Sequence, residues 1–318
     1  MNIIRMSGGL GNQMFQYALY LKLRSLGKEV KFDDINEYRS ENVRPIMLSV
    51  FGIEYPRASW QEIVEFTDGS MDIWKRIRRN IFGRKAIEYC ESGFYDPQVL
   101  SFDSMYLRGS FQSEKYFADM KEEVRDTYRF PELERMHLPE KLYNSTMGYL
   151  DQIAGSEAVG IHMYRSDSRT DEELYEGICT EKYYAGAVKY IQEKYPDATF
   201  FIFSNEPKWV KKLVDQLVKS QITEEMTRTQ IKEMKKRFVM VETNTEYTGY
   251  LDMMLMSKCR HNVISNSSFS WWAAWLNDNK EKIVIAPSRW NNENGSDEVF
   301  AKGMILMDAQ GEVKRQIY

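Results

Sequence analysis

The chain has 318 residues, which at roughly 150 residues per domain predicts two domains. Its hydrophobic content of 43% and aromatic content of 14% are typical of a globular protein with a large core. A net charge of −4 argues against general nucleic-acid binding, so no nucleic-acid partner is expected.

Cysteine and histidine residues are few and scattered. Cysteines stand at positions 90, 179 and 259 and histidines at 137, 162 and 261, without the close spacing of a metal site, so no metal is expected. An odd set of cysteines favours reduced thiols and a cytoplasmic protein. The amino terminus is typical of a strand rather than a signal peptide, and no apolar run approaches the roughly 20 residues of a membrane span.

The chain begins with the pattern of a βαβ unit. Asn2–Met6 predicts a buried strand, Ser7–Gly11 a turn, Asn12–Leu26 a helix, and Glu29–Asp33 a second strand. The helix is apolar nearly all round, which indicates that it is buried between layers of an α/β fold.

Residues 36–150 have a less regular pattern. Helical patches are predicted at Trp60–Phe66, Met71–Asn80 and Glu114–Tyr128, a short strand at Met105–Arg108, and a connection between the two halves at Arg129–Lys141. The segment Trp74–Ile87 mixes basic and bulky apolar residues. We interpret it as a solvated helix face, and the alternative is an interfacial contact with a membrane that carries the substrate.

The second half alternates strands and helices. Strands are predicted at Ala158–Met163, Thr199–Ser204, Arg237–Glu242, Asn262–Ser265 and Lys282–Pro287, with helices after Thr180, from Pro207 and over Glu246–Lys258. The helical pattern over Lys208–Lys236 is longer than a single helix that connects two parallel strands requires, which indicates a surface insertion. The pattern predicts an α/β protein of two Rossmann-like domains that face each other across a cleft, with ligands at the carboxyl ends of the strands.

A glycine-rich turn, SGGLGNQMFQ, follows the first strand. Gly8, Gly9 and Gly11 permit close approach of the backbone to a ligand. Together with Asp33 they suggest a dinucleotide site and hence a nicotinamide oxidoreductase, but Met14 stands where that fingerprint needs a small residue. The amides of Asn12 and Gln13 instead favour a site that orients an acceptor sugar or a leaving phosphate.

The strand Ala158–Met163 runs into His162, Arg165 and Asp167. A guanidinium at a strand end can make paired hydrogen bonds to a diphosphate, and a carboxylate there can accept a proton from an attacking hydroxyl. The alternative is an exposed Arg–Asp pair beside a structural histidine.

The segment His261–Asn277 is the most informative part of the chain. Asn266, Ser267 and Ser268 separate a strand from an aromatic-rich helix, so backbone N–H groups and hydroxyls would converge on one spot, as in an anion site. The alternative is a simple helix cap. Asp252, on the preceding helix, could accept both N–H donors of a guanine edge.

These three segments together resemble the α-1,2-fucosyltransferases of glycosyltransferase family 11. The motifs are GGLGNQMFQYA, the histidine–arginine–aspartate strand end and HNVISNSSFSWWAAWL. The resemblance implies a GT-B-like architecture and an inverting, metal-independent transfer of fucose from GDP-β-L-fucose to the 2-OH of a terminal galactose. We assign residues 1–150 to an acceptor-side domain and 151–318 to a donor domain, whose last residues could pack back on the first.

The resemblance also implies roles for individual residues. Asp252 would read guanine, Ser267 and Ser268 would bind the β-phosphate, and Asn12 would lie near the reacting centre. The full nucleotide-binding set that it implies is His162, Arg165, Asp252, Asn266, Ser267, Ser268, Phe269, Gly9, Gly11 and Gln13. Asp167 is our expected general base, with Asp171 and Glu172 as alternatives, and Arg165 would oppose the charge of the leaving group.

One departure from the family pattern bears on activity. Tyr164 replaces the first arginine of the strand end His-x-Arg-Arg-Gly-Asp, and Ser166 replaces its glycine. Loss of a charge-assisted contact of this kind costs on the order of 1.5–3 kcal/mol. The alternative functions are therefore a weakened GDP-sugar- or glycan-binding homologue and a transferase with a different donor sugar. We expect a cytoplasmic protein without an integral span or a cofactor. Its partners would be GDP-fucose and a galactose-containing glycan, and a lipid-linked acceptor would place it at the inner membrane face.

Overall fold

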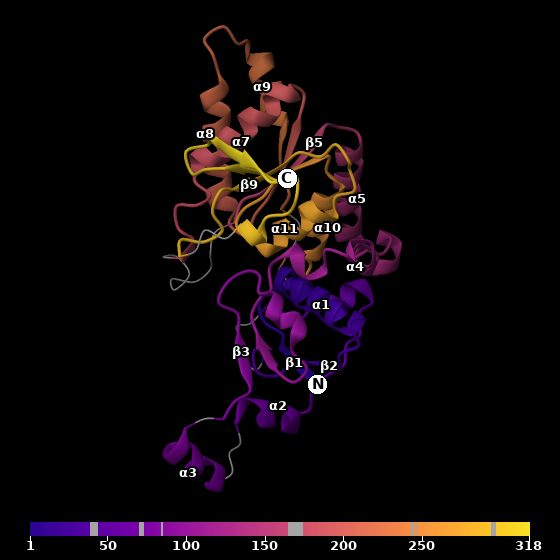
Figure 1. Ribbon diagram of the computed structural model, residues 1–318. Coiled ribbons are helices and arrows are strands. Elements are labelled where there is room, and N and C mark those ends of the chain that lie inside the picture. Colours follow the sequence, from indigo (N-terminus) through magenta and orange to yellow (C-terminus); the bar gives the residue numbers. More distant parts are fainter. Residues whose placement is uncertain are drawn as a thin grey trace. The chain divides into compact units, whose positions relative to one another are not determined.

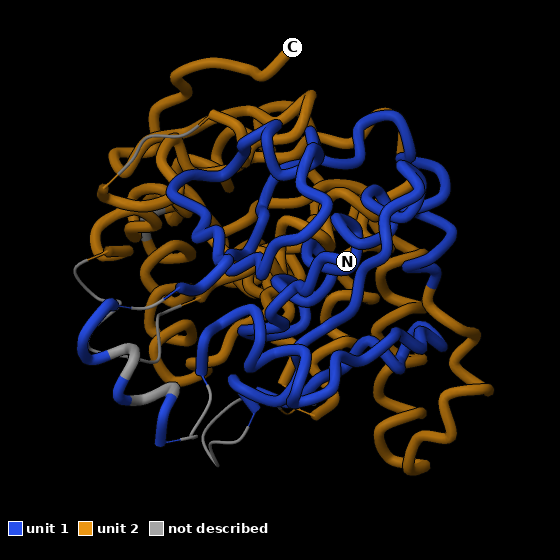
Figure 2. The backbone as a smooth tube through the Cα atoms, turned by 60° about the horizontal axis from the view of Figure 1, so that its bottom comes forward, with its two compact units in different colours: residues 1–129 blue, residues 130–318 orange. Residues whose placement is uncertain are grey.

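The computed structural model describes residues 1–38, 44–69, 73–83, 85–164, 174–242, 245, 247–293 and 297–318. The chain divides into two compact units, Met1–Arg129 and Phe130–Tyr318 (Figure 2). We expected the boundary near residue 150. It falls earlier because helix α5 (Glu140–Ala154) packs with helix α10 (Tyr250–Lys258), in a cluster of buried side chains that includes Leu133, Leu251 and Met254.

The first unit contains a parallel sheet with the order β2-β1-β4-β3 (Figure 1). Its strands are β1 (Asn2–Arg5), β2 (Val30–Asp33), β3 (Glu88–Cys90) and β4 (Tyr106–Arg108). Helix α1 (Leu10–Ser25) connects β1 to β2, which confirms the predicted βαβ unit. The helix is buried on most sides because Phe15 packs against Phe117 and Tyr128 donates a hydrogen bond to the Met14 carbonyl.

Short helices make up much of the remainder of the first unit. They are η1 (Leu48–Phe51), α2 (Trp60–Thr67), α3 (Ile73–Phe82), η2 (Pro97–Ser101), η3 (Glu114–Phe117) and α4 (Lys121–Thr127). The predicted continuous helix Glu114–Tyr128 is wrong, because the chain turns between η3 and α4, where the Met120 N–H bonds the Phe117 carbonyl. Helix α2 begins at a capping box formed by Ser59 and Glu62.

The second unit contains a longer sheet with the order β11-β10-β9-β8-β5-β6-β7. Its strands are β5 (Ala158–His162), β6 (Thr199–Phe203), β7 (Phe238–Met240), β8 (His261–Val263), β9 (Val284–Pro287), β10 (Ile305–Met307) and β11 (Val313–Gln316). The pairings are parallel except that β11 runs antiparallel to β10. The last residues of the chain therefore form an edge strand of their own unit's sheet.

Helices cover both faces of this sheet. Helices α7 (Glu181–Lys194) and α8 (Pro207–Gln221) pack on one face, in a core that includes Val159, Ile161, Phe200 and Ile202. Helix α10 packs on the other, where Gly160 faces Met256. The predicted insertion corresponds to the end of α8 and to α9 (Arg228–Lys236), which has no buried residue and lies on the surface. Helix α11 (Ser268–Leu276) and the short helices η4 (Leu133–Met136) and η5 (Asp297–Val299) complete the unit.

The α/β class and the parallel sheets that we predicted are confirmed. Strands β5, β6, β8 and β9 of the second unit are buried along nearly their whole length, as parallel strands covered on both faces should be. None of the helices in the described ranges combines the length and the apolar character needed to cross a bilayer.

Helix α7 and the β10–β11 turn meet through two glycines. A Cβ on Gly186 would collide with the backbone of Gly311, and Gly311 itself has a positive φ of 83°. We expect Gly186→Ala to lower the free energy of unfolding by about 1–3 kcal/mol, because the neighbouring atoms are backbone and cannot move aside.

Urea unfolding of the two variants Gly186→Ala and Gly148→Ala tests this. Gly148 lies in α5 with nothing within 4 Å of its added Cβ, so Gly148→Ala should instead stabilise the helix by roughly 0.5–1 kcal/mol. Equal effects of the two substitutions would contradict the packing argument.

Candidate functional site

The carboxyl edge of the second unit's sheet gathers polar side chains from separate parts of the sequence. His162 ends β5 and is buried, and its Nδ1 lies 2.8 Å from the Ser265 Oγ, just after the neighbouring strand β8. Its ring packs beside those of Tyr164 and Phe269, at centroid distances of 5.9 and 5.4 Å. The structure therefore brings together His162 and the start of α11, two of the segments that the sequence singled out.

The loop between β8 and α11 is held in one conformation by its own hydrogen bonds. The Ser267 N–H donates to the Ser265 carbonyl at 2.8 Å, and the Ser270 hydroxyl donates to the carbonyls of both Ser265 and Ser267. Ser267 is the N-cap residue of α11, yet its side chain does not cap the helix. Ser267 and Ser268 are half-buried at the helix start, where backbone N–H groups lack intrahelical partners and favour an anion.

Asn266 is held by the protein on both ends of its amide. Its Nδ2 donates to the Trp290 carbonyl at 3.2 Å, and its Oδ1 accepts from the Cys179 thiol at 3.4 Å. Burial raises the pKa of Cys179 to about 12, so the thiol stays protonated and can donate. Asn266 therefore shapes the loop through its side chain, and its predicted role in binding lies with the backbone that follows it.

The aromatic residues of α11 anchor the helix in the core. Trp271 and Trp272 are fully buried, and the Trp271 indole N–H donates to the Val299 carbonyl at 2.7 Å. Trp275 stacks on Trp271 with an interplanar angle of 12°. These rings fix the position of the helix start, which is what a preorganised anion site requires.

Asp252 lies in the first turn of α10, the helix that precedes β8. A helix that connects two parallel strands begins at their carboxyl edge, so Asp252 lies at the same edge as His162. The pKa of Tyr149 is raised mainly by burial and further by the charges of Glu242 and Asp252.

Four other predicted residues, Arg165, Asp167, Asp171 and Glu172, lie outside the described residues. The base and the diphosphate-binding arginine therefore remain predictions from the sequence. In the described parts of the chain, His, Cys, Asp and Glu side chains form no group that could hold a metal ion.

The glycine-rich turn of the first unit is tightly built. Gly8 has a φ of 72°, and a Cβ at this position would collide with the Asn12 amide. Gly9 is the N-cap residue of α1 and lies beside the Arg44 side chain. The helix thus begins earlier than predicted, at Leu10, and Gly11 and Asn12 lie in its first turn. The Asn12 Oδ1 accepts a hydrogen bond from the Gln112 Nε2 at 2.8 Å, which fixes the orientation of the amide.

Gln13 is fully buried, and its amide is occupied by the protein. Its Nε2 donates to the Gly8 and Pro45 carbonyls and to the Tyr38 hydroxyl, and its Oε1 accepts from the Met47 N–H. These bonds help to hold the turn in place, and the ligand contact that we predicted for Gln13 stays a prediction.

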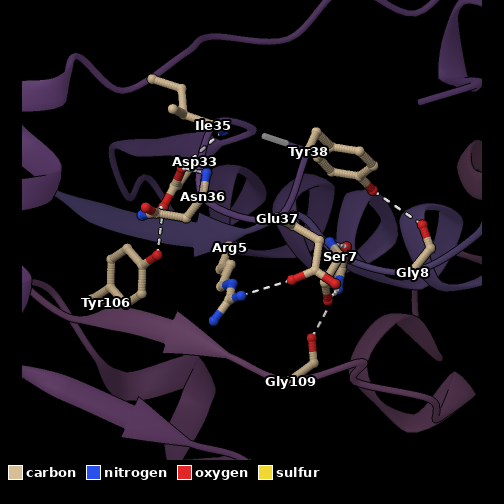
Figure 3. Close-up of polar contacts among 11 residues, drawn as sticks. Arg5, Ser7, Gly8, Asp33, Ile35, Asn36, Glu37, Tyr38, Tyr106 and Gly109 are labelled. Atoms are coloured by element: carbon tan, nitrogen blue, oxygen red, sulfur yellow. Dashed lines mark hydrogen bonds and ion pairs between the residues drawn. The ribbon is translucent and has the colours of Figure 1, made fainter. Parts of the chain in front are cut away.

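Figure 3 shows the polar network around this turn, at the carboxyl ends of β1, β2 and β4. Asp33 is fully buried, and its oxygens accept from the backbone of Ile35 and Asn36, the Asn36 amide and the Tyr106 hydroxyl. A carboxylate so engaged is not available to a ribose, which argues against the nicotinamide alternative. Arg5 pairs with Glu37 at 2.6 Å in the same network.

Three residues of this region escaped the sequence reasoning: Gln16, Glu91 and Gln112. The Gln16 Nε2 donates to the Gly109 carbonyl at 2.9 Å, which ties α1 to the loop after β4. The Glu91 Oε2 accepts from the Ser110 and Phe111 N–H groups of that loop. The signal available was Gln16 itself, a polar residue between the apolar residues Phe15 and Tyr17 of α1.

Comparison with known proteins identifies the family of the chain. The family model described as "Glycosyl transferase family 11" matches residues 1–305. An alpha-1,2-colitosyltransferase of Escherichia coli is 28% identical over 91% of this chain and 91% of that protein. The O-antigen biosynthesis glycosyltransferase WbnK of Escherichia coli is 27% identical, over 96% and 97%.

A more distant relative comes from a mammal. The galactoside alpha-(1,2)-fucosyltransferase 1 of Bos taurus is 23% identical over 85% of this chain and 64% of that protein, so the match leaves about a third of the bovine protein uncovered. Because the family model spans nearly the whole sequence, this chain belongs to glycosyltransferase family 11.

Proposed function

We propose that this glycosyltransferase is a galactoside α-1,2-fucosyltransferase that moves L-fucose from GDP-β-L-fucose to the 2-OH of a terminal galactose. The observation that carries the proposal is the carboxyl edge of the second sheet, where His162 contacts Ser265 and α11 begins. Family membership and relatives named for α-1,2 transfer support it.

In the proposed complex the second unit holds the nucleotide. Asp252 accepts from the N1–H and the exocyclic amine of guanine, His162 and Arg165 hold the nucleotide, and the β-phosphate lies against Ser267, Ser268 and the start of α11. A carboxylate that accepts two donors at once distinguishes guanine from adenine, which lacks that pair of donors.

The proposed reaction is a single displacement with inversion. The acceptor oxygen forms a bond to the anomeric carbon of fucose, the bond from that carbon to the β-phosphate oxygen breaks, and the hydroxyl proton passes to a carboxylate, for which Asp167 is our candidate. Negative charge on the departing GDP is met by Arg165, the two serine hydroxyls and the helix N–H groups, an electrostatic role that fixed donors perform well. Asn12, fixed by Gln112, would orient the reacting groups from the first unit.

A transferase with another donor sugar is the second candidate. The specific observation in its favour is that the colitosyltransferase is more similar to this chain, at 28% identity, than the bovine fucosyltransferase, at 23%. Tyr164, in place of an arginine, also departs from the fucosyltransferase pattern and stacks beside His162.

Incubation with labelled GDP-fucose and a panel of galactosides tests the proposal, with the product linkage determined by NMR. We expect an α-1,2-linked product that forms equally well in the presence of EDTA. A product only from an activated colitose donor would establish the second candidate. Binding of GDP in calorimetry without turnover of either donor would indicate a homologue that has lost catalysis.

A further inference from the structure

Helix α3 of the first unit exposes a concentrated apolar surface. The side chains of Trp74 and Phe82 are 75% and 74% exposed, and those of Ile73 and Ile81 are each 66% exposed. Figure 1 shows α3 set apart from β1, β2 and α1 of its own unit. Soluble proteins seldom leave several large apolar side chains together in water, so a surface of this kind marks a contact site.

The spacing of these residues places most of them on one side of the helix. At about 100° per residue, Ile73, Ile77, Ile81 and Trp74 fall within an arc of roughly 100°. The helix is therefore amphipathic with a continuous apolar stripe, along which Ile77 is also exposed.

The composition of the helix defines the partner. Its ten residues, IWKRIRRNIF, include four lysines and arginines and no acidic residue, in a chain whose net charge is −4. A short, cationic, amphipathic helix with tryptophan and phenylalanine is the composition that binds the headgroup region of anionic bilayers, where both the apolar stripe and the cations find a partner.

We propose that α3 is a peripheral membrane anchor that inserts Trp74, Ile81 and Phe82 into the interface of a bilayer rich in anionic phospholipid. This anchor goes beyond the proposed function and does not depend on it. It would bring the first unit, which we expect to bind the acceptor, to the surface where a lipid-linked glycan is presented. In a symmetric dimer through this helix, the rival occupant, α3 of one copy would meet the cationic α3 of the other and find no complementary charge.

Co-sedimentation of the full-length protein with vesicles tests the anchor. The vesicles are phosphatidylcholine alone or phosphatidylcholine mixed with phosphatidylglycerol. We expect binding to the mixed vesicles that weakens as salt is raised, because ions screen the cationic residues. The double variant Trp74→Ala/Phe82→Ala should bind at least about tenfold more weakly, since both side chains leave the interface.

Tyr247→Ala is the matched control, because Tyr247 is 73% exposed but lies in the second unit, outside α3. It should bind vesicles as the parent does. If the double variant loses its circular dichroism signal, the single variant Ile81→Ser replaces it in the same assay. Equal binding by parent and α3 variants, or equal binding to the two vesicle types, would overturn the proposal.

Two further measurements distinguish a failure of the membrane-anchor proposal from a failure of the proposed function. Light scattering without lipid would reveal a dimer that the double variant abolishes, in which case α3 is a self-association surface and the anchor is refuted. Transfer to a soluble galactoside should be unchanged in Trp74→Ala/Phe82→Ala, since these residues lie outside the proposed donor site. Vesicle binding without transferase activity would refute the proposed function alone.

Discussion

Asp252→Asn is expected to lower kcat/KM for GDP-fucose by roughly 10- to 150-fold, the equivalent of the 1.5–3 kcal/mol that a hydrogen bond to a charged group contributes. The asparagine keeps the size of the side chain but replaces one acceptor oxygen with a donor, which would face a donor of guanine. The measurement is initial-rate kinetics with a galactoside acceptor, supported by calorimetry of GDP binding.

Inosine diphosphate sharpens this experiment because it lacks the exocyclic amine of guanine. The parent protein should bind GDP more tightly than inosine diphosphate, and Asp252→Asn should remove most of that preference. Glu242→Gln is the control, because Glu242 is exposed and, like Asp252, raises the pKa of Tyr149 through its charge. If Glu242→Gln abolishes the preference and Asp252→Asn leaves it intact, guanine recognition belongs to Glu242.

Regular elements were predicted best where the sequence pattern alone determines the structure. The βαβ start and the strand before Asn266 have buried runs bounded by glycine or small polar residues, and both are present. Strands β3, β10 and β11 were not predicted, because a run of three or four residues carries too little signal. Strand β3 pairs with β4, whose residues lie 18 positions further along the chain, whereas β11 pairs with the adjacent strand β10.

In the candidate site, too, some features could be predicted from the sequence and others could not. His162 and Ser268 stand in recognisable strand-end motifs, so their common location followed from the topology of a parallel sheet. The hydrogen bonds of Gln13 could not be predicted from the sequence. Its hydrogen-bond partners come from Gly8, Tyr38, Pro45 and Met47, and only the folded loop brings these groups to one amide.

Glu91 is the clearest case of a residue whose importance appears only in the structure. It follows β3, and a Cβ at Gly109 would collide with its side chain, so the loop after β4 passes directly over the carboxyl group. Its Oε2 accepts the N–H groups of Ser110 and Phe111 at 2.9 and 2.8 Å. Phe111 has a φ of 51°, a strained conformation for a bulky residue that this carboxylate helps to maintain.

Glu91 should make stability depend on pH in a direction opposite to that of most carboxyl groups. Its Oε1 is buried without a partner among the described residues. Burial raises the pKa to about 7 from an ordinary value of 4.5, against the opposing effect of the two N–H donors. The folded state therefore holds a proton that the unfolded chain has released between these pH values. The resulting stabilisation is fully present below about pH 4.5 and is lost as pH rises through about 7.

Urea unfolding of the parent and Glu91→Gln across this range measures the effect. The glutamine can accept the same two N–H groups but does not titrate. At roughly 1.4 kcal/mol per pKa unit, the parent should lose on the order of 3 kcal/mol relative to Glu91→Gln between pH 4.5 and 8. Glu65→Gln is the control, because Glu65 is an exposed residue of α2 in the same unit. This variant measures how much the loss of one exposed carboxylate changes the free energy of unfolding. A parent that gains stability relative to Glu91→Gln as pH rises would show that the two N–H donors outweigh burial.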